Sequence, residues 1–248
     1  MLKLLIILSV VGVSLSANWD YLTYTLLWPQ TFCKYNQCNY DKTKVTGWNI
    51  HGLWPSNITG KDPSKCKGDP FNINDLNSIF PDLVVQWANL LEFTNPAEFW
   101  THEWTKHGLC AILPPLFTNE LSYFSHSLQL KQFVSLDKIL SDNDIQPSDD
   151  KQYDTDSVSK SVSSKLGVLP KLECIKIEDD YYLSAVEICF DDQLKPINCP
   201  KHHHDNVDSQ LKDLIHQIFQ KVEGHLLLSD ATKPINIPCN DNSFYIPV

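Results

Sequence analysis

The sequence predicts a single α+β domain in which a central antiparallel sheet is packed by several helices and held by four disulfides. Three observations favour this class. Segments with the period-2 pattern of strands occur beside segments with helical stripes of apolar residues. No linker rich in Pro, Gly or Ser divides residues 18–248, and no repeat period is present. Eight cysteines are spread from Cys33 to Cys239, which indicates one framework of cross-links.

The first residues have the pattern of a secretory signal peptide. One lysine precedes an unbroken apolar run, and small residues follow at Ser14, Ser16 and Ala17. The run is shorter than the ~20 apolar residues that a membrane span needs. We therefore expect residues 1–17 to be cleaved, and the rest to be secreted or delivered to a lysosomal or vacuolar lumen, without a membrane anchor.

The elements of the N-terminal half follow from patterns and their terminators. Alternating residues predict a strand over 22–28, which Pro29 ends. Residues 83–91 have the pattern of a buried helix. Asn95 followed by Pro is typical of a helix start, so the next helix carries the segment FWTHEWTKHG and ends at Gly108.

The C-terminal half is predicted in the same way. Helical patterns cover residues 121–140, 156–166 and 211–222, the last with a regular apolar stripe. Strand patterns cover residues 171–177 and 181–190 around an acidic turn, with an edge strand at 235–237. Helices and strands are therefore mixed along one chain, as in an α+β domain.

The charge of the chain limits its function. The formal net charge is -10, and every cationic side chain is Lys because the chain contains no Arg. Non-specific binding of nucleic acid depends on many phosphate contacts from basic groups. The composition therefore argues against a general nucleic-acid-binding module. It is compatible with an enzyme that has a local cationic pocket, or that works at acidic pH, where its nine His are charged.

The even number of cysteines favours four disulfides in an oxidising compartment, although the sequence alone leaves about a hundred pairings open. Zinc is the competing use of cysteine. The spacings from Cys33 to Cys38 and from Cys189 to Cys199 are too wide for a CxxC knuckle. One glycosylation sequon is present, at Asn57, which predicts a glycan on a surface loop.

Two short segments carry the residues suited to chemistry. The first, NIHGLWP, places His51 between an apolar run and a Gly-Leu-Trp-Pro turn, so we expect its imidazole at a strand end near an aromatic ring. Alone this is weak support for catalysis, because a His beside a Trp is more often a packed, hydrogen-bonded residue.

The second segment, FWTHEWTKHGLC, is more informative because a helix advances ~100° per residue. Four polar side chains fall on one side, at ~0°, ~100°, ~40° and ~140°: His102, Glu103, Lys106 and His107. Phe99 and Trp104 are expected on the opposite, core-facing side. The alternative is a solvated face with an i,i+4 pair of Glu103 and His107.

The same segment resembles the HExxH zinc signature at first sight. Zinc-binding histidines at i and i+4 lie ~40° apart on a helix, whereas His102 and His107 are at i and i+5, ~140° apart. We therefore expect no metal and no other cofactor. Two imidazoles, a cation and a carboxyl group suit metal-free phosphodiester transfer, in which one imidazole removes a proton and the other donates one. If the nucleophile is the 2′-hydroxyl of the substrate, DNA is not cleaved.

These segments resemble the two active-site motifs of the ribonuclease T2 family. HGLWP matches at residues 51–55 and HEWTKHGLC at residues 102–110. LLWPQTFC at residues 26–33 is similar to the first strand of the family, and YFSHSLQL and DIQPS resemble its later helices. All eight cysteines also have counterparts, so the resemblance spans nearly the whole mature chain.

The resemblance implies a monomeric acid endoribonuclease that converts single-stranded RNA to 2′,3′-cyclic phosphates and then to 3′-phosphates. By the same resemblance His107 is the general base, His51 the general acid, and Trp54 the aromatic on which a base stacks. The residues that hold the phosphate are His102, Glu103 and Lys106. The implied disulfides are Cys33–Cys38, Cys66–Cys110, Cys174–Cys239 and Cys189–Cys199.

Departures from the family pattern leave base preference open. Many members have an acidic residue after HGLWP where this chain has Ser56, and many have Gln where it has Leu27. A second hypothesis is a secreted binding or signalling protein that keeps the fold without needing cleavage. The intact pair His51 and His107 favours the enzyme. We expect no metal site at residues 202–204, where three adjacent His lie in a polar segment.

Overall fold

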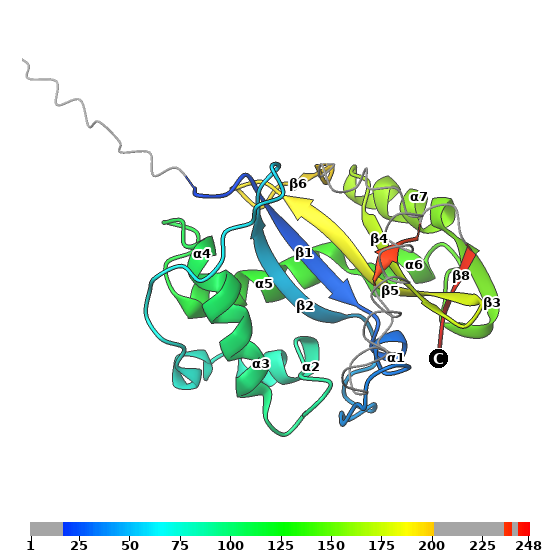
Figure 1. Ribbon diagram of the computed structural model, residues 1–248, viewed down its shortest axis with the longest axis horizontal. Coiled ribbons are helices and arrows are strands. Elements are labelled where there is room, and N and C mark those ends of the chain that lie inside the picture. The colour runs from blue at the N-terminus through cyan, green and yellow to red at the C-terminus, as the bar shows by residue number, and fades with distance from the viewer. Residues whose placement is uncertain (1–16, 201–235, 240–242) are drawn as a thin grey trace, which may run out of the picture.

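The computed structural model describes residues 17–200, 236–239 and 243–248, which form one sheet surrounded by helices (Figure 1). The main path through the sheet runs β2-β1-β5-β4-β7, and every pair along it is antiparallel. Strands β3, β6 and β8 extend its margins. The strands are β1 Tyr21–Leu27, β2 Asn49–Ser56, β3 Ser148–Asp154, β4 Lys171–Ile177, β5 Asp180–Phe190, β6 Pro196–Ile197, β7 Ile237–Pro238 and β8 Ser243–Ile246.

The helices gather in two groups. Figure 1 shows α2 to α5 beside β1 and β2, and α6 and α7 beside β3 and β4. Their bounds are α1 Pro29–Phe32, the 3₁₀ turn η1 Ile73–Leu76, α2 Phe80–Gln86, α3 Pro96–Glu103, the π-helix η2 Trp104–Gly108, α4 Leu109–Ala111, α5 Glu120–Val134, α6 Leu136–Ser141 and α7 Thr155–Leu166. The predicted α+β class is therefore confirmed.

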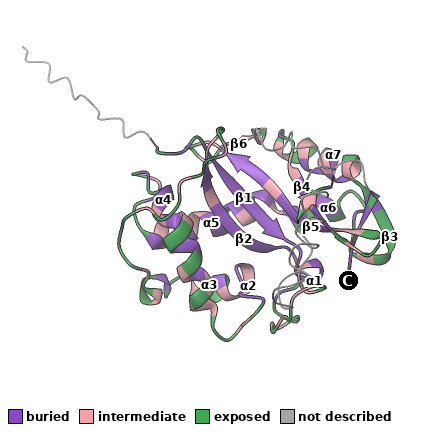
Figure 2. Ribbon diagram, viewed as in Figure 1, coloured by how far each residue is buried: buried purple, intermediate pink, exposed green. Residues whose placement is uncertain are grey.

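The core lies between the sheet and α5. All seven residues of β1 are buried, and the central strands are the most buried part of Figure 2. Helix α5 begins with a capping box at Asn119 and Ser122. Its buried tyrosine, Tyr123, donates to the Leu53 carbonyl of β2 at 2.7 Å, and Tyr24 of β1 donates to the Ser127 carbonyl at 3.0 Å. These bonds fix β2 and β1 relative to α5 and leave neither tyrosine hydroxyl unpaired.

Four disulfides form, and they are the four pairs that the family resemblance implied: Cys33–Cys38, Cys66–Cys110, Cys174–Cys239 and Cys189–Cys199. The Cys66–Cys110 bond joins the long segment after β2 to α4, at the end of the helical stretch that carries the second motif.

Two predicted helices were wrong in their extent. The helix predicted over 83–91 begins at Phe80 and ends at Gln86. It ends there because the residues that follow bond elsewhere. The Trp87 indole donates to the His51 carbonyl at 3.0 Å, and Asn89 Oδ1 accepts from the backbone N–H groups of Leu91 and Glu92. The helix predicted over 121–140 is divided into α5 and α6 at Ser135, whose φ of 47° is left-handed.

Several predicted segments fall partly or wholly outside the described residues: the leader over 1–16, the His tract at 202–204 and the helix at 211–222. The edge strand predicted at 235–237 is present as β7, Ile237–Pro238, which pairs with β4. Within the described part of the chain, no helix combines the length and the apolar composition that crossing a membrane requires.

Candidate active site

His51 is the extra residue of a β-bulge in β2. Thr25 of β1 pairs with Gly52 and Leu26 pairs with Ile50, so His51 has no partner across the strand pair. Ile50 and Leu53 are both fully buried in the core. In a regular strand, residues three positions apart point to opposite faces of the sheet. The bulge shifts this alternation by one residue, and the half-buried side chains of His51 and Trp54 therefore share one face.

This placement corrects the prediction that His51 sits at a strand end before a Gly-Leu-Trp-Pro turn. The residues after His51 continue β2 to Ser56 instead of turning. The bulge is fixed from outside the strand, because Trp87 Nε1 donates to the His51 carbonyl. Asn49, fully buried, also accepts from the Ala88 amide at 2.9 Å and donates to the Ala88 carbonyl at 3.1 Å.

The second motif changes from an α-helix to a π-helix in its middle. Helix α3 ends at Glu103, and η2 continues to Gly108, with the Leu109 amide donating to the Trp104 carbonyl five residues earlier. Gly108 was predicted to end the helix, but it has right-handed helical geometry and the chain continues into α4. A side chain at Gly108 would collide with the buried Trp104 ring, so its small size serves packing. π-Turns within helices are frequent at functional sites.

The π-turn corrects the geometric exclusion of a metal. In a π-helix the bonded residues are five apart, so side chains at i and i+5 approach one another. The ring centroids of His102 and His107 are 6.3 Å apart. One nitrogen or oxygen ligand atom from each of His102, Glu103 and His107 lies within 4.8 Å of the others. The ~140° separation expected from an ideal α-helix is therefore wrong for these two histidines.

Trp54 joins the two motifs. Its ring centroid lies 5.0 Å from that of His51 and 5.3 Å from that of His107. Its Nε1 donates to Glu103 Oε2 at 2.9 Å. A Cβ at Gly52 would overlap Trp54 Nε1 and lie 2.5 Å from Glu103 Oε2, so only glycine leaves room for this pair. Two segments about fifty residues apart in sequence thus meet around one indole ring.

The site changes the proton affinities of its groups. Burial lowers the pKa of His51 to about 4 and that of His107 to about 3, and the positive charges of Lys106 and His102 add to both shifts. Partial burial and the nearby positive charge of Lys106 also lower the pKa of His102. Burial raises the pKa of Glu103 to about 8, against the opposing effects of Trp54 and Lys106. Near pH 6 the free site therefore holds neutral His51 and His107 imidazoles and a neutral Glu103 carboxyl group.

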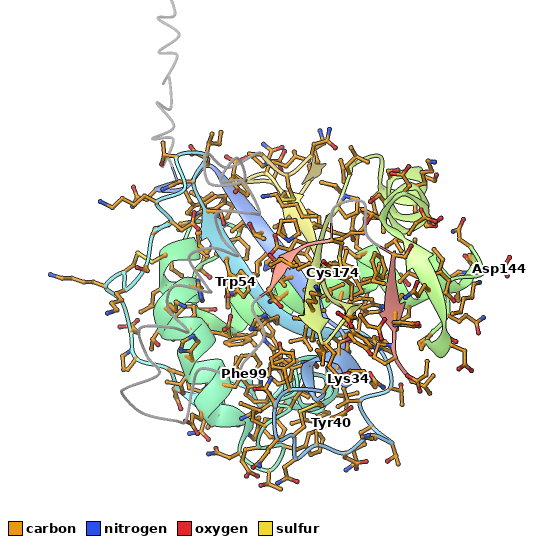
Figure 3. The ribbon with its side chains drawn as sticks, turned by 45° about the vertical axis from the view of Figure 1, so that its right-hand side comes forward. Lys34, Tyr40, Trp54, Phe99, Asp144 and Cys174 are labelled. Atoms are coloured by element: carbon orange, nitrogen blue, oxygen red, sulfur yellow. A yellow bond between two sulfur atoms is a disulfide. The ribbon has the colours of Figure 1, made fainter. Side chains whose placement is uncertain are left out.

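A pocket of about 330 Å³ opens beside His51. Its lining is mostly apolar. The lining residues are Leu27, Phe32, Asn49, His51, Ala88, Asn89, Leu90, Leu91 and Phe99. Figure 3 labels Trp54 of β2 and Phe99 of α3, the two aromatic side chains that approach His51 from different elements.

Phe99 was predicted on the core-facing side with Trp104. Trp104 is buried as expected, and Phe99 is partly buried and packs against the core. Phe99 also lines the pocket, with its ring centroid 6.3 Å from that of His51. Phe99 precedes His102 by three positions, nearly one helical turn, so it belongs to the polar side of α3. Sequence reasoning also missed Asn49, although Asn49 lies within the NIHGLWP segment that drew attention.

Leu27 and Ser56, the two positions that depart from the family pattern, are both buried near this site. Leu27 is buried and lines the pocket. Ser56 is buried, and its hydroxyl bonds with Thr23 Oγ1 at 2.9 Å and donates to the Trp54 carbonyl at 3.1 Å. Asn57 follows β2 in a loop whose next two residues are exposed, and its Nδ2 donates to the Lys61 carbonyl.

Comparison with known proteins agrees with the motifs. The chain matches the sequence model of the Ribonuclease T2 family over residues 19–199. Ribonuclease Oy of Magallana gigas is 35% identical over 189 residues, which cover 74% of this chain and 89% of that protein. Ribonuclease T2 of Danio rerio is 35% identical over 198 residues, 78% of each chain. The structure of RNase NT in complex with 5'-AMP matches with a TM-score of 0.67 at 26% identity, covering 75% of this chain and 93% of that one. The chain therefore belongs to the ribonuclease T2 family.

Proposed function

We propose that this protein is an endoribonuclease that cleaves single-stranded RNA by metal-independent transesterification. The observation that carries the proposal is the meeting of His51 with His102, Glu103, Lys106 and His107 around Trp54. Two imidazoles beside a cation and a carboxyl group supply a base, an acid and charge stabilisation for a pentacoordinate phosphorus.

In the proposed reaction neutral His107 takes the proton of the 2′-hydroxyl, and the 2′-oxygen attacks the adjacent phosphorus. Lys106 and His102 stabilise the charge that develops on the non-bridging oxygens. Protonated His51 then gives its proton to the departing 5′-oxygen, leaving a 2′,3′-cyclic phosphate. Water opens this ring more slowly, with the two histidines in exchanged roles, to give the 3′-phosphate. DNA has no 2′-hydroxyl and is not a substrate.

The electrostatics of the site suit an acidic working pH. The low pKa of His107 keeps it neutral as a base, whereas His51 must gain a proton to act as an acid. An anionic phosphate bound beside His51 favours its charged form. Glu103 stays protonated below pH 8, so it can donate a hydrogen bond to a phosphate oxygen without repelling the substrate.

The pocket beside His51 suits a nucleobase. A flat base can stack on Phe99, and stacking on an aromatic ring is worth ~1 to 3 kcal/mol per base. We assign this pocket to the nucleotide on the 5′-oxygen side of the scissile bond, because His51 is the proposed acid at that oxygen. Trp54 is the proposed stacking partner on the other side.

We further propose that residues 1–17 form a signal peptide, and that residues 18–248 are one catalytic domain released as a monomer into the medium or into a lysosomal or vacuolar lumen. The family match begins directly after this leader, at residue 19. Four disulfides suit an oxidising route, and the exposed loop at Asn57 suits a glycan. N-terminal sequencing of the mature protein and its mass before and after glycosidase treatment test these points.

A chimeric oligonucleotide tests the activity. It consists of DNA with a single ribonucleotide and is incubated with the protein between pH 4 and 7, in parallel reactions with and without EDTA. We expect one cut, on the 3′ side of the ribonucleotide, with a 2′,3′-cyclic phosphate identified by mass. Absence of cleavage would favour the binding or signalling role, and loss of activity in EDTA with rescue by Zn²⁺ would overturn the metal-independent mechanism.

A further inference from the structure

Residues 61–67 carry a concentration of positive charge that the two motifs do not use. The stretch KDPSKCK is the only run of seven residues in the sequence with three lysines, in a chain whose formal net charge is -10. Lys61, Lys65 and Lys67 are all exposed. Among the described residues, none of the three takes part in an ion pair. Their charges are therefore available to an anionic partner.

This stretch is tied to both motifs. It follows the end of β2, where Asp62 Oδ1 accepts from the first backbone amide after the strand at 2.7 Å. Cys66 is bonded to Cys110 of α4, directly after η2, and Figure 1 shows the chain passing α4 after it leaves β2. Just beyond, the Asp69 carbonyl accepts from the Trp104 indole of η2 at 3.0 Å. These ties hold the lysines beside the second motif.

The direction of β2 gives the part of the substrate that the lysines face. The pocket lies at the Asn49 end of β2, whereas Trp54 is near the other end, from which residues 57–69 continue. The pocket is assigned above to the nucleotide on the 5′-oxygen side of the scissile bond, and Trp54 to the nucleotide that supplies the 2′-hydroxyl. A strand that continues on the 5′ side of the cut therefore passes Trp54 and reaches the three lysines.

We propose that Lys61, Lys65 and Lys67 form a lysine strip that binds the phosphates of single-stranded RNA on the 5′ side of the cut. The inference deepens the proposed function and rests on it. A lysine binds phosphate as a point charge on a flexible stem and does not read bases. The lysine strip therefore favours long strands over dinucleotides, whatever their sequence.

The distribution of charge over the molecule supports this assignment. Lys106 is exposed on η2 and extends the positive charge from the lysine strip toward the scissile phosphate. Asp62, which could oppose the strip, is bonded to the amide that follows β2. Residues 142–156, by contrast, carry six Asp and one Lys, and Figure 1 shows β3 and α7 at the opposite end of the sheet from α4. Such an asymmetry directs a polyanion toward the lysine strip.

The test uses chimeric oligonucleotides with one ribonucleotide, so that the position of the cut is fixed. One substrate is the dinucleotide alone, the second adds about six deoxynucleotides on its 5′ side, and the third adds the same number on its 3′ side. We expect the 5′ extension to raise kcat/KM ~10-fold or more at low salt. Each phosphate contact on a single strand contributes ~0.7 to the salt slope, so three contacts add a ~100-fold fall in kcat/KM per tenfold rise in salt.

The lysine variant removes the three charges together, as Lys61→Gln, Lys65→Gln and Lys67→Gln. Its ratio of kcat/KM between the 5′-extended strand and the dinucleotide should fall ~10-fold or more, and the added salt dependence should disappear. The matched control makes the same change of charge at exposed lysines of α6 and α7, as Lys138→Gln, Lys160→Gln and Lys165→Gln. The control should keep the wild-type ratio, and melting curves show that both variants are folded.

A labelled strand made entirely of DNA measures binding apart from cleavage, because it has no 2′-hydroxyl. At low salt its fluorescence anisotropy should show ~10-fold or more weaker binding to the lysine variant than to the control. Lysine-dependent binding by a protein that does not cleave RNA supports the lysine strip and contradicts the proposed function.

Three results would overturn the lysine strip while the proposed function stands. In the first, the protein cleaves RNA and the lysine variant keeps the wild-type ratio between the extended strand and the dinucleotide. In the second, the control loses as much of this ratio as the lysine variant, so that general charge accounts for the effect. In the third, only the 3′ extension raises kcat/KM, which contradicts the side assigned to the lysines.

Discussion

Gly52 has no room for even a methyl group, and this makes Gly52→Ala a sharp test of how the two motifs meet. The added Cβ would overlap Trp54 Nε1 and lie 2.5 Å from Glu103 Oε2. Glu103 is buried, and the Trp54 ring contacts the imidazoles of His51 and His107, so neither partner can move freely. The hydrogen bond between them, 2.9 Å long, must break or lengthen.

The expected cost has two parts. Overpacking a filled site costs ~1 to 3 kcal/mol of unfolding free energy, and leaving a buried polar group without its partner adds a similar amount. Displacing Trp54 from its stacking position removes ~1 to 3 kcal/mol from substrate and transition-state binding, which corresponds to a ~5- to 150-fold fall in kcat/KM. Denaturant unfolding and steady-state cleavage of a dinucleotide measure these two effects separately.

Gly47→Ala is the matched control. Its Cβ would overlap the Asp137 carboxylate, which accepts from the Trp48 amide at 3.2 Å just before β2 begins. The change is chemically the same and also destabilises, but its nearest atoms all belong to Asp137. We expect a lower unfolding free energy with kcat/KM near that of the wild type. If Gly52→Ala also keeps wild-type kcat/KM, the Trp54–Glu103 contact does not organise the site.

Three further predictions follow from the site. The profile of kcat/KM against pH should be bell-shaped with an acidic maximum, because the pKa values of His51 and His107 are lowered to about 4 and about 3. On the alkaline side of the maximum, kcat/KM should fall by up to ~10-fold per pH unit. A maximum above pH 7 would contradict these shifts. The pKa of Glu103 is raised to about 8 from 4.5, so its contribution to stability is present below pH 4.5 and is lost as pH rises toward 8. The unfolding free energy measured across this pH range should therefore decline less in Glu103→Gln than in the wild type. An identical decline in both proteins would count against a buried neutral carboxyl group. Phe99→Ala should raise KM ~5-fold or more with a smaller effect on kcat, since the pocket is proposed to bind a base, and an unchanged KM would remove the base from this pocket.

Local sequence patterns predicted the parts of the fold that depend on local chemistry. Alternation located β1, β4 and β5 to within a residue or two, because successive side chains of a strand point to opposite faces of the sheet. Asn95 and Pro96 placed the start of α3 correctly, since Pro at the first helical position loses no hydrogen bond. The structure also brings residues of the two motifs together around Trp54, and their catalytic roles stay predictions.

The remaining features depend on distant partners. Nothing within residues 49–56 indicates that His51 is bulged, because the bulge is fixed by the Trp87 indole and the pairing with β1. The π-turn over η2 is equally invisible to a helical wheel, which assumes ~100° at every residue. That assumption misplaced the approach of His102 to His107, whose ring centroids are 6.3 Å apart. It does not account for Phe99, because a regular wheel already puts Phe99 ~60° from His102.

The most direct test of the account compares His51→Ala, His107→Ala and the double variant in cleavage of single-stranded RNA at acidic pH. A positioned acid or base contributes ~10²- to 10⁴-fold, so each single variant should lose at least ~10²-fold in kcat/KM while keeping a cooperative melting transition. Because the two imidazoles act on one phosphorus as a unit, the double variant should lose little more than either single variant. Near-normal cleavage by folded His51→Ala, or losses in the double variant that simply multiply, would contradict catalysis by this histidine pair.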